Sequence, residues 1–148
     1  MAKQIDLTVS IPNSTGAIRS QLRHAADLER IALAGGATEA TATVEGNVTT
    51  LTRFIDVPPA GRTYLKTDQL TITETRVWNQ NGADLEITVA DLPISVIGSL
   101  ELTEHGITTI LHIVARVEAR MGVASPLAEG VIKDRLVAAV NAECEALY

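Results

Sequence analysis

The sequence contains few aromatic residues and almost no cysteine, and its charge is acidic rather than basic. Aromatic residues make up 3% of the 148 residues, and Cys144 is the only cysteine. A single cysteine excludes an internal disulfide and any cysteine-rich zinc site. Twelve lysines and arginines against eighteen acidic residues give a net charge of −6. That balance argues against nucleic-acid binding, because such affinity comes largely from neutralising phosphates.

Long apolar runs and the common catalytic motifs are also missing. Residues 1–6 (MAKQID) begin no apolar stretch, so we expect no signal peptide, no stable membrane insertion and a cytoplasmic location. His24, His105 and His112 do not have the spacing of metal ligands, so we expect no metal site. No phosphate loop, dinucleotide fingerprint or Gly-x-Ser-x-Gly elbow is found, so we expect no cofactor.

The composition is that of a folded chain with one domain over residues 1–148. Hydrophobic residues make up 46% and charged residues 20%, and a chain of this length can bury a sizeable core. Residues 3–11 alternate between apolar and polar side chains, which predicts a half-buried strand. Residues 15–34 carry two helical stripes that do not align, which predicts two short helices with a break near Arg23 and His24.

From Thr38 onward the apolar residues alternate with polar ones, which predicts six strands in an antiparallel meander. Ser125 and Pro126 then predict a helix start, with Ser125 as the N-cap. The helix should run from Pro126 nearly to the last residue and cover the apolar face of the sheet. Its apolar stripe consists of Ile132, Leu136, Val140, Cys144 and Leu147.

This order of elements resembles the helix-grip fold of the START-like (SRPBCC) superfamily, which includes polyketide cyclases and the birch pollen allergen. Residues 73–78 (TETRVW), the strand that contains Gly98 and the closing segment 122–148 are also similar to a bacterial branch of unknown function. The resemblance implies an α+β fold, in which a bent seven-stranded antiparallel sheet surrounds the C-terminal helix. It implies an apolar cavity for a lipid, a polyketide or a similar molecule, and it carries over no catalytic residues.

Two strands mix charged and apolar residues on one face. Arg53 shares a face with Leu51, Ile55 and Val57 in residues 48–57. Glu74, Arg76 and Trp78 share a face in residues 70–79, opposite threonines. If the threonine faces lie outside, the charged residues point inward, where buried charges must pair. One glutamate between two arginines leaves a guanidinium able to meet an anionic ligand. We therefore predict a ligand-binding anchor made of Arg53, Glu74, Arg76 and Trp78.

The alternative interpretation places these charges on the solvated surface as a cross-strand network of little energetic value. Burial of Arg53 and Arg76 decides between the two. Lys133 and Glu143 flank the helix stripe and either face the cavity or extend to its rim.

Three functions remain open. The first is binding of a hydrophobic or amphipathic small molecule between sheet and helix. The second is an enzyme of the polyketide cyclase or hydratase type, with Glu74 as its acid or base, although an arginine neighbour lowers the pKa of that carboxyl. The third is a ligand-free homodimeric module that pairs through outward apolar residues such as Ile110 and Val114. A cavity of roughly 300 Å³ or more favours the first two.

Overall fold

The computed structural model of the protein describes residues 2–57, 59, 62–63 and 66–147. A 3₁₀ turn precedes the last helix, and the order of elements is the expected β-α-α-β6-α. The elements in chain order are β1 (Lys3–Ile11), α1 (Thr15–Leu22), α2 (Ala25–Ala34), β2 (Glu39–Glu45), β3 (Val48–Asp56), β4 (Gln69–Trp78), β5 (Gly82–Val89), β6 (Ile94–His105), β7 (Thr108–Ala119), the 3₁₀ turn (Gly122–Ala124) and α4 (Ser125–Glu145).

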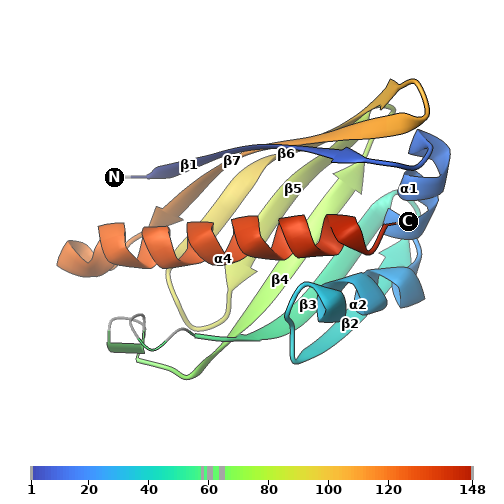
Figure 1. The fold of residues 1–148 in the computed structure, drawn as a ribbon. Helices are drawn as coiled ribbons and strands as arrows, with labels where there is room; N and C mark the ends of the chain where they lie inside the picture. The colour runs from blue at the N-terminus through green and yellow to red at the C-terminus, as the bar shows by residue number, and fades with distance from the viewer. Residues whose placement is uncertain (1, 58, 60–61, 64–65, 148) are drawn as a thin grey trace.

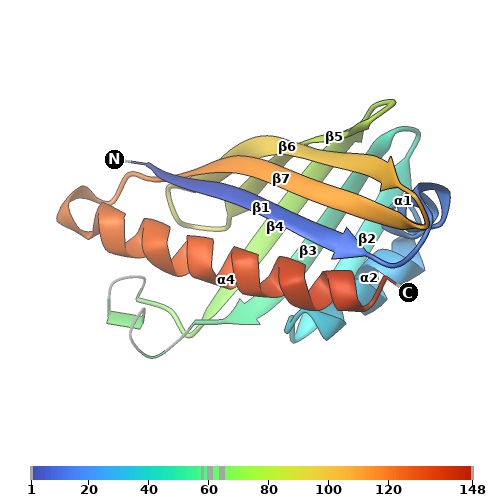
Figure 2. The same cartoon turned by 45° about the horizontal axis from the view of Figure 1, so that its top comes forward.

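The strands form one seven-stranded sheet in the order β1-β7-β6-β5-β4-β3-β2, and every neighbouring pair is antiparallel. Strands β2 to β7 follow one another as a meander, and β1 adds to the β7 edge. The sheet bends around α4, which lies along its concave side (Figures 1 and 2). The expected α+β architecture is therefore confirmed.

The two short helices lie at the end of the sheet where α4 finishes (Figure 1). The predicted break between them is confirmed, because α1 ends at Leu22 and α2 begins at Ala25. Ser14 caps α1 by accepting a hydrogen bond from the backbone N–H of Ala17 at 3.2 Å, as N-cap residues do. This placement brings the end of α2 against the last turns of α4.

The predicted N-cap of the long helix is wrong. Ser125 is already the first residue of α4, and its hydroxyl accepts from the backbone N–H of Met121 at 2.8 Å. The 3₁₀ turn before it already has near-helical geometry, so the chain enters α4 without an extended cap residue. The Ser125 hydroxyl therefore binds a backbone N–H that precedes it in the chain rather than one in the first turn of the helix. The helix ends at Glu145, a little before the expected end.

The core lies between the concave face of the sheet and α4. Ile11 of β1, Val117 of β7 and Ile132 of α4 are almost completely buried. Burial of each large aliphatic side chain stabilises the fold by roughly 1.5–3 kcal/mol. Within the described ranges, no helix is both long and apolar enough to cross a membrane.

Candidate functional site

The charged residues of β3 and β4 point into the molecule. Arg53 lies on the same buried face of β3 as Leu51 and Ile55. Glu74 and Arg76 lie on the buried face of β4, opposite its threonines. Arg53, Glu74 and Arg76 are 4%, 4% and 9% exposed. This burial shows that the three charged side chains point inward, and it excludes a solvated network on the sheet surface.

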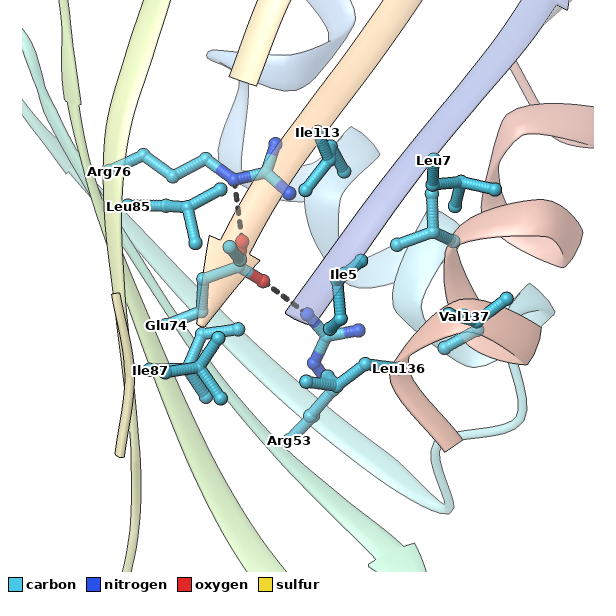
Figure 3. A pocket seen from close by; sticks show the side chains of 14 residues that line it. Ile5, Leu7, Arg53, Glu74, Arg76, Leu85, Ile87, Ile113, Leu136 and Val137 are labelled. Carbon is cyan, nitrogen blue, oxygen red and sulfur yellow. Dashed lines mark hydrogen bonds and ion pairs between the residues drawn. The ribbon is translucent and has the colours of Figure 1, made fainter. Parts of the chain in front are cut away.

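Strand register brings the charges together. Arg53 lies opposite Ile72, so Glu74 is its diagonal neighbour on the same face, within reach of a long side chain. The guanidinium of Arg53 donates through Nη2 to Oε1 of Glu74. Arg76 donates through Nε to the other carboxylate oxygen, Oε2, at 2.7 Å. Figure 3 shows Glu74 between the two arginines.

Glu143 of α4 completes the cluster from the opposite layer. Its Oε1 accepts a hydrogen bond from Nη1 of Arg53, and its side chain is 9% exposed. Gly35, the C-cap of α2, packs closely against this side chain, because a Cβ at Gly35 would lie 2.7 Å from Cγ of Glu143. We call these four residues, Arg53, Glu74, Arg76 and Glu143, the charge cluster.

The two carboxyls of the charge cluster differ in their electrostatics. Burial favours the protonated form of Glu74, but Arg76 and Arg53 outweigh it and hold the pKa of the Glu74 carboxyl below its usual value. Burial raises the pKa of Glu143, and the nearby charge of Glu74 raises it further; Arg53 and Arg76 lower it but do not reverse the shift. The pKa of Arg53 is raised, because the pull of Glu143 and Glu74 exceeds the effect of burial. Glu74 is therefore a fixed anion, and Glu143 is the carboxyl that gains a proton more readily.

The charge cluster retains unused donors. Nη1 of Arg76 and Nε of Arg53 are buried and have no hydrogen-bond partner among the described residues. Leaving a buried donor of a charged group without a partner costs about 1–3 kcal/mol or more. Such atoms are where an acceptor from outside the protein gains most.

An internal cavity of about 30 Å³ lies beside the charge cluster, and we call it the inner cavity. Arg53, Glu74 and Arg76 line its polar side, and aliphatic side chains such as Ile5, Leu7 and Val137 line the rest (Figure 3). This volume holds about one water molecule. Side chains thus fill most of the space between the sheet and α4. The inner cavity is far smaller than a typical ligand site of roughly 300–1,000 Å³.

A larger hollow of about 330 Å³, the side cleft, lies between the end of α2, α4 and the strands β3 and β4. Gly35, Ile55, Ile72, Arg135 and the small alanines of α4 line it. The side cleft and the inner cavity share Arg53, Leu136 and Ala139 as lining residues. These shared side chains form the wall between the two spaces.

Trp78 is buried as expected, but it makes no hydrogen bond with the four residues of the charge cluster. Its Nε1 donates to Oγ1 of Thr49 at 3.0 Å, and the guanidinium of Arg19 lies 5.3 Å from its ring centre. Trp78 is absent from the lining of the inner cavity. The structure therefore brings three of the four predicted anchor residues together. The fourth, Trp78, is the last residue of β4.

Sequence reasoning placed Glu143 only as a flanking residue and did not single out Glu129. Glu129 is fully buried, and its Oε2 accepts from the backbone N–H of Ala119 at 2.9 Å, which ties α4 to the end of β7. Both glutamates lie three residues from a member of the apolar stripe: Glu129 before the buried Ile132, and Glu143 after the half-buried Val140. That spacing puts them on the sheet-facing side of the helix. It is the sequence feature that could have predicted their burial.

The remaining candidates do not form a second site. Burial, together with neighbouring Glu143, raises the pKa of the Cys144 thiol to about 11, which makes it a poor nucleophile near neutral pH. His112 faces outward and pairs with Asp6 at 2.7 Å. In the part of the chain that the structure describes, no three acidic, histidine or cysteine side chains gather as a metal site would need.

The outer face of the sheet carries the residues named for dimerisation. Val114 is exposed, and Ile110 on the same strand is half-buried. Pairing of this face with a second copy stays a prediction.

Comparison with known proteins identifies the architecture. No family model matches the chain, and no curated protein matches it. Solved structures do match, among them the ZhuI aromatase/cyclase from Streptomyces sp. R1128, with a TM-score of 0.75 at 14% identity. That match covers 99% of this chain and 94% of that chain. The chain has the helix-grip fold.

Other helix-grip structures are similar over the same length. Norcoclaurine synthase from Thalictrum flavum, solved as a point mutant with a transition-state analogue, gives a TM-score of 0.67 at 14% identity and covers 99% of this chain and 94% of that chain. Ara h 8.0201 gives 0.65 at 12% identity and covers 99% and 95%. The similar structures include an aromatase/cyclase and a synthase as well as Ara h 8.0201, so the function has to be argued from the site itself.

Proposed function

We propose that the protein binds an amphipathic small molecule, lipid- or polyketide-like in character, between the sheet and α4. The observation that carries this proposal is the buried Nη1 of Arg76, which lacks a partner within the described residues and lies among aliphatic side chains. Apolar walls with a few placed polar groups are typical of small-ligand sites. The ligand places a hydrogen-bond acceptor on Arg76 and its apolar part against the walls.

Access comes from the side cleft. Its volume of about 330 Å³ accommodates a small ligand, and Arg53 lies in its lining as it does in that of the inner cavity. Leu136 forms part of the shared wall, so this route requires the Leu136 side chain to move. Exposed side-chain rotamers interconvert within nanoseconds and packed ones more slowly, which makes such opening compatible with reversible binding.

The state of Glu74 argues against an enzyme in which Glu74 is the acid or base. A general acid or base needs a pKa near the working pH, whereas the pKa of Glu74 is held low by its two arginines in spite of burial. An arginine–carboxylate pair of this kind is suited to fixing the position of a guanidinium rather than to moving protons.

The test uses 2-octanone, a neutral molecule with one acceptor and an aliphatic chain. Wild-type protein is expected to bind it in isothermal titration calorimetry. Arg76→Met should weaken the affinity by roughly tenfold or more, because a hydrogen bond to a charged group contributes about 1.5–3 kcal/mol.

Arg116→Met is the matched control, since Arg116 is an exposed arginine of β7, and it should bind as the wild type does. Thermal melts of both variants establish that they are folded. Absence of binding to the wild type, or equal affinity in folded Arg76→Met, contradicts the proposed function.

A further inference from the structure

Arg76 and Glu143 share a second small space next to the inner cavity. This space has a volume of about 20 Å³, and both residues line it together with Cys144. Val140 and Ile113 line this space as well as the inner cavity. An acceptor that binds Arg76 here therefore lies in the same enclosed region as the Glu143 carboxyl.

The charges of the cluster already balance. Arg53 and Arg76 carry two positive charges, and Glu74 and Glu143 supply two carboxylates, all four side chains being about nine-tenths buried or more. A ligand carboxylate would add one negative charge where solvent is largely excluded, and an uncompensated buried charge is costly. One of the carboxyls must then take up a proton.

Glu143 is the carboxyl suited to that role. Glu74 binds an arginine with each oxygen, whereas the ion pair of Glu143 uses Oε1 and one arginine. Glu143 also has the raised pKa of the pair, through burial and the nearby charge of Glu74.

The other groups around Glu143 do not compete for this proton. The α2 helix presents the backbone of Gly35, and its Arg30 is engaged with the carbonyl of Ala146 at 3.2 Å. The thiol of Cys144 is already protonated, because burial and Glu143 raise its pKa to about 11. Strands β6 and β7 contribute only apolar side chains to the shared space, namely Leu100, Leu111 and Ile113.

We propose that the ligand of this site carries a single carboxylate, which binds Arg76 while Glu143 takes up one proton from solvent. This inference rests on the proposed function, and it adds the chemical class of the ligand and a proton coupling. The protonated Glu143 keeps its place beside Arg53 as a neutral acceptor. Carboxylate binding then proceeds without a net change of charge inside the protein.

The first experiment needs no variant. Octanoate binding to the wild type is measured by calorimetry at pH 7 in buffers of different ionisation enthalpy. The dependence of the observed enthalpy on the buffer should correspond to nearly one proton taken up per octanoate. Octanoate itself is ionised throughout, so its affinity should fall between pH 6 and pH 8 by up to tenfold per pH unit, while that of 2-octanone stays level.

The second experiment compares Glu143→Gln with Glu145→Gln, a control at an exposed position of the same helix. Glu143→Gln should bind octanoate roughly tenfold more tightly at pH 7, because no second carboxylate then has to be neutralised beside the bound one. It should bind without proton uptake. Glu145→Gln should behave as the wild type does.

The outcomes separate the two proposals. If 2-octanone binds in an Arg76-dependent manner while octanoate takes up no proton, the proton coupling is overturned and the proposed function stands. Octanoate binding no tighter to folded Glu143→Gln overturns it as well. If neither compound binds the wild type, both proposals fall.

Discussion

Replacing Glu74 with glutamine is expected to lower the free energy of unfolding by about 3–5 kcal/mol, the usual cost of breaking a buried ion pair by removing one partner. Glu74 is 4% exposed and is the residue that both arginines bind. Its loss leaves Arg53 and Arg76 facing a neutral amide inside the core. Urea denaturation followed by circular dichroism measures the change.

Two controls give this prediction its specificity. Glu86→Gln, at an exposed position of β5, should alter stability by less than about 0.5 kcal/mol. The pKa of Glu74 is lowered from its ordinary value of 4.5, so its stabilisation is present above that pH and is lost as the pH falls through its native pKa. The difference in the free energy of unfolding between the wild type and Glu74→Gln should therefore become smaller as the pH is lowered. A loss below about 1 kcal/mol at pH 7 would contradict the buried cluster.

A fully apolar replacement of the charge cluster separates stability from function. Replacing Arg53 and Arg76 with methionine, and Glu74 and Glu143 with leucine, removes every charge at once. Buried ion pairs replaced in this way are often neutral or stabilising by about 1–4 kcal/mol. The quadruple variant should recover most of the stability lost by Glu74→Gln, which would mean that the fold does not depend on these charges.

Replacing Gly98 with alanine is expected to destabilise the protein by more than about 3 kcal/mol, beyond the usual range for overpacking. A Cβ at this position of β6 would lie 2.1 Å from the carbonyl oxygen of Val114 and 2.6 Å from Cα of Ala115. Both atoms belong to the backbone of β7, which is fixed by pairing on either side. The close approach of the two strands requires glycine.

Gly16→Ala provides the matched control. Gly16 lies in α1, and a Cβ there would have no neighbour within 4 Å. Because alanine favours helix over glycine, this variant should be stabilised by up to about 1 kcal/mol. Thermal melts and soluble yield compare the two variants, and similar stability of Gly98→Ala and Gly16→Ala would show that β6 and β7 are not so closely packed.

The alternation of residues in the sequence predicted which way the site points. Arg53, Glu74 and Arg76 share faces with aliphatic residues and stand opposite threonines. Side chains alternate between the two faces of a strand, so burial of the aliphatic residues implies that the charged residues on the same face also point inward. Trp78 followed the same rule and is buried, but strand alternation does not give the position along a strand at which side chains meet. It pairs with Thr49 at the far end of the strand.

The contribution of α4 and the size of the cavities were beyond the sequence. Glu143 has helix-stripe spacing, but its contact with Arg53 and the close approach of Gly35 to its side chain come from the packing of α2 against α4. The free volume depends on how completely side chains such as Leu136 fill the space under the sheet. Packing at this level is set by the whole fold rather than by any local pattern.

The proposed function requires that the protein carries a ligand bound to Arg76 between the sheet and α4 in the cell. Native mass spectrometry of the protein purified from the organism that makes it tests this requirement most directly. We expect the wild-type chain to carry the added mass of one small organic molecule, which is released on denaturation. Arg76→Met produced in the same host should show the mass of the bare chain. A bare wild-type chain, or an equal adduct on both proteins, would contradict a ligand site centred on Arg76.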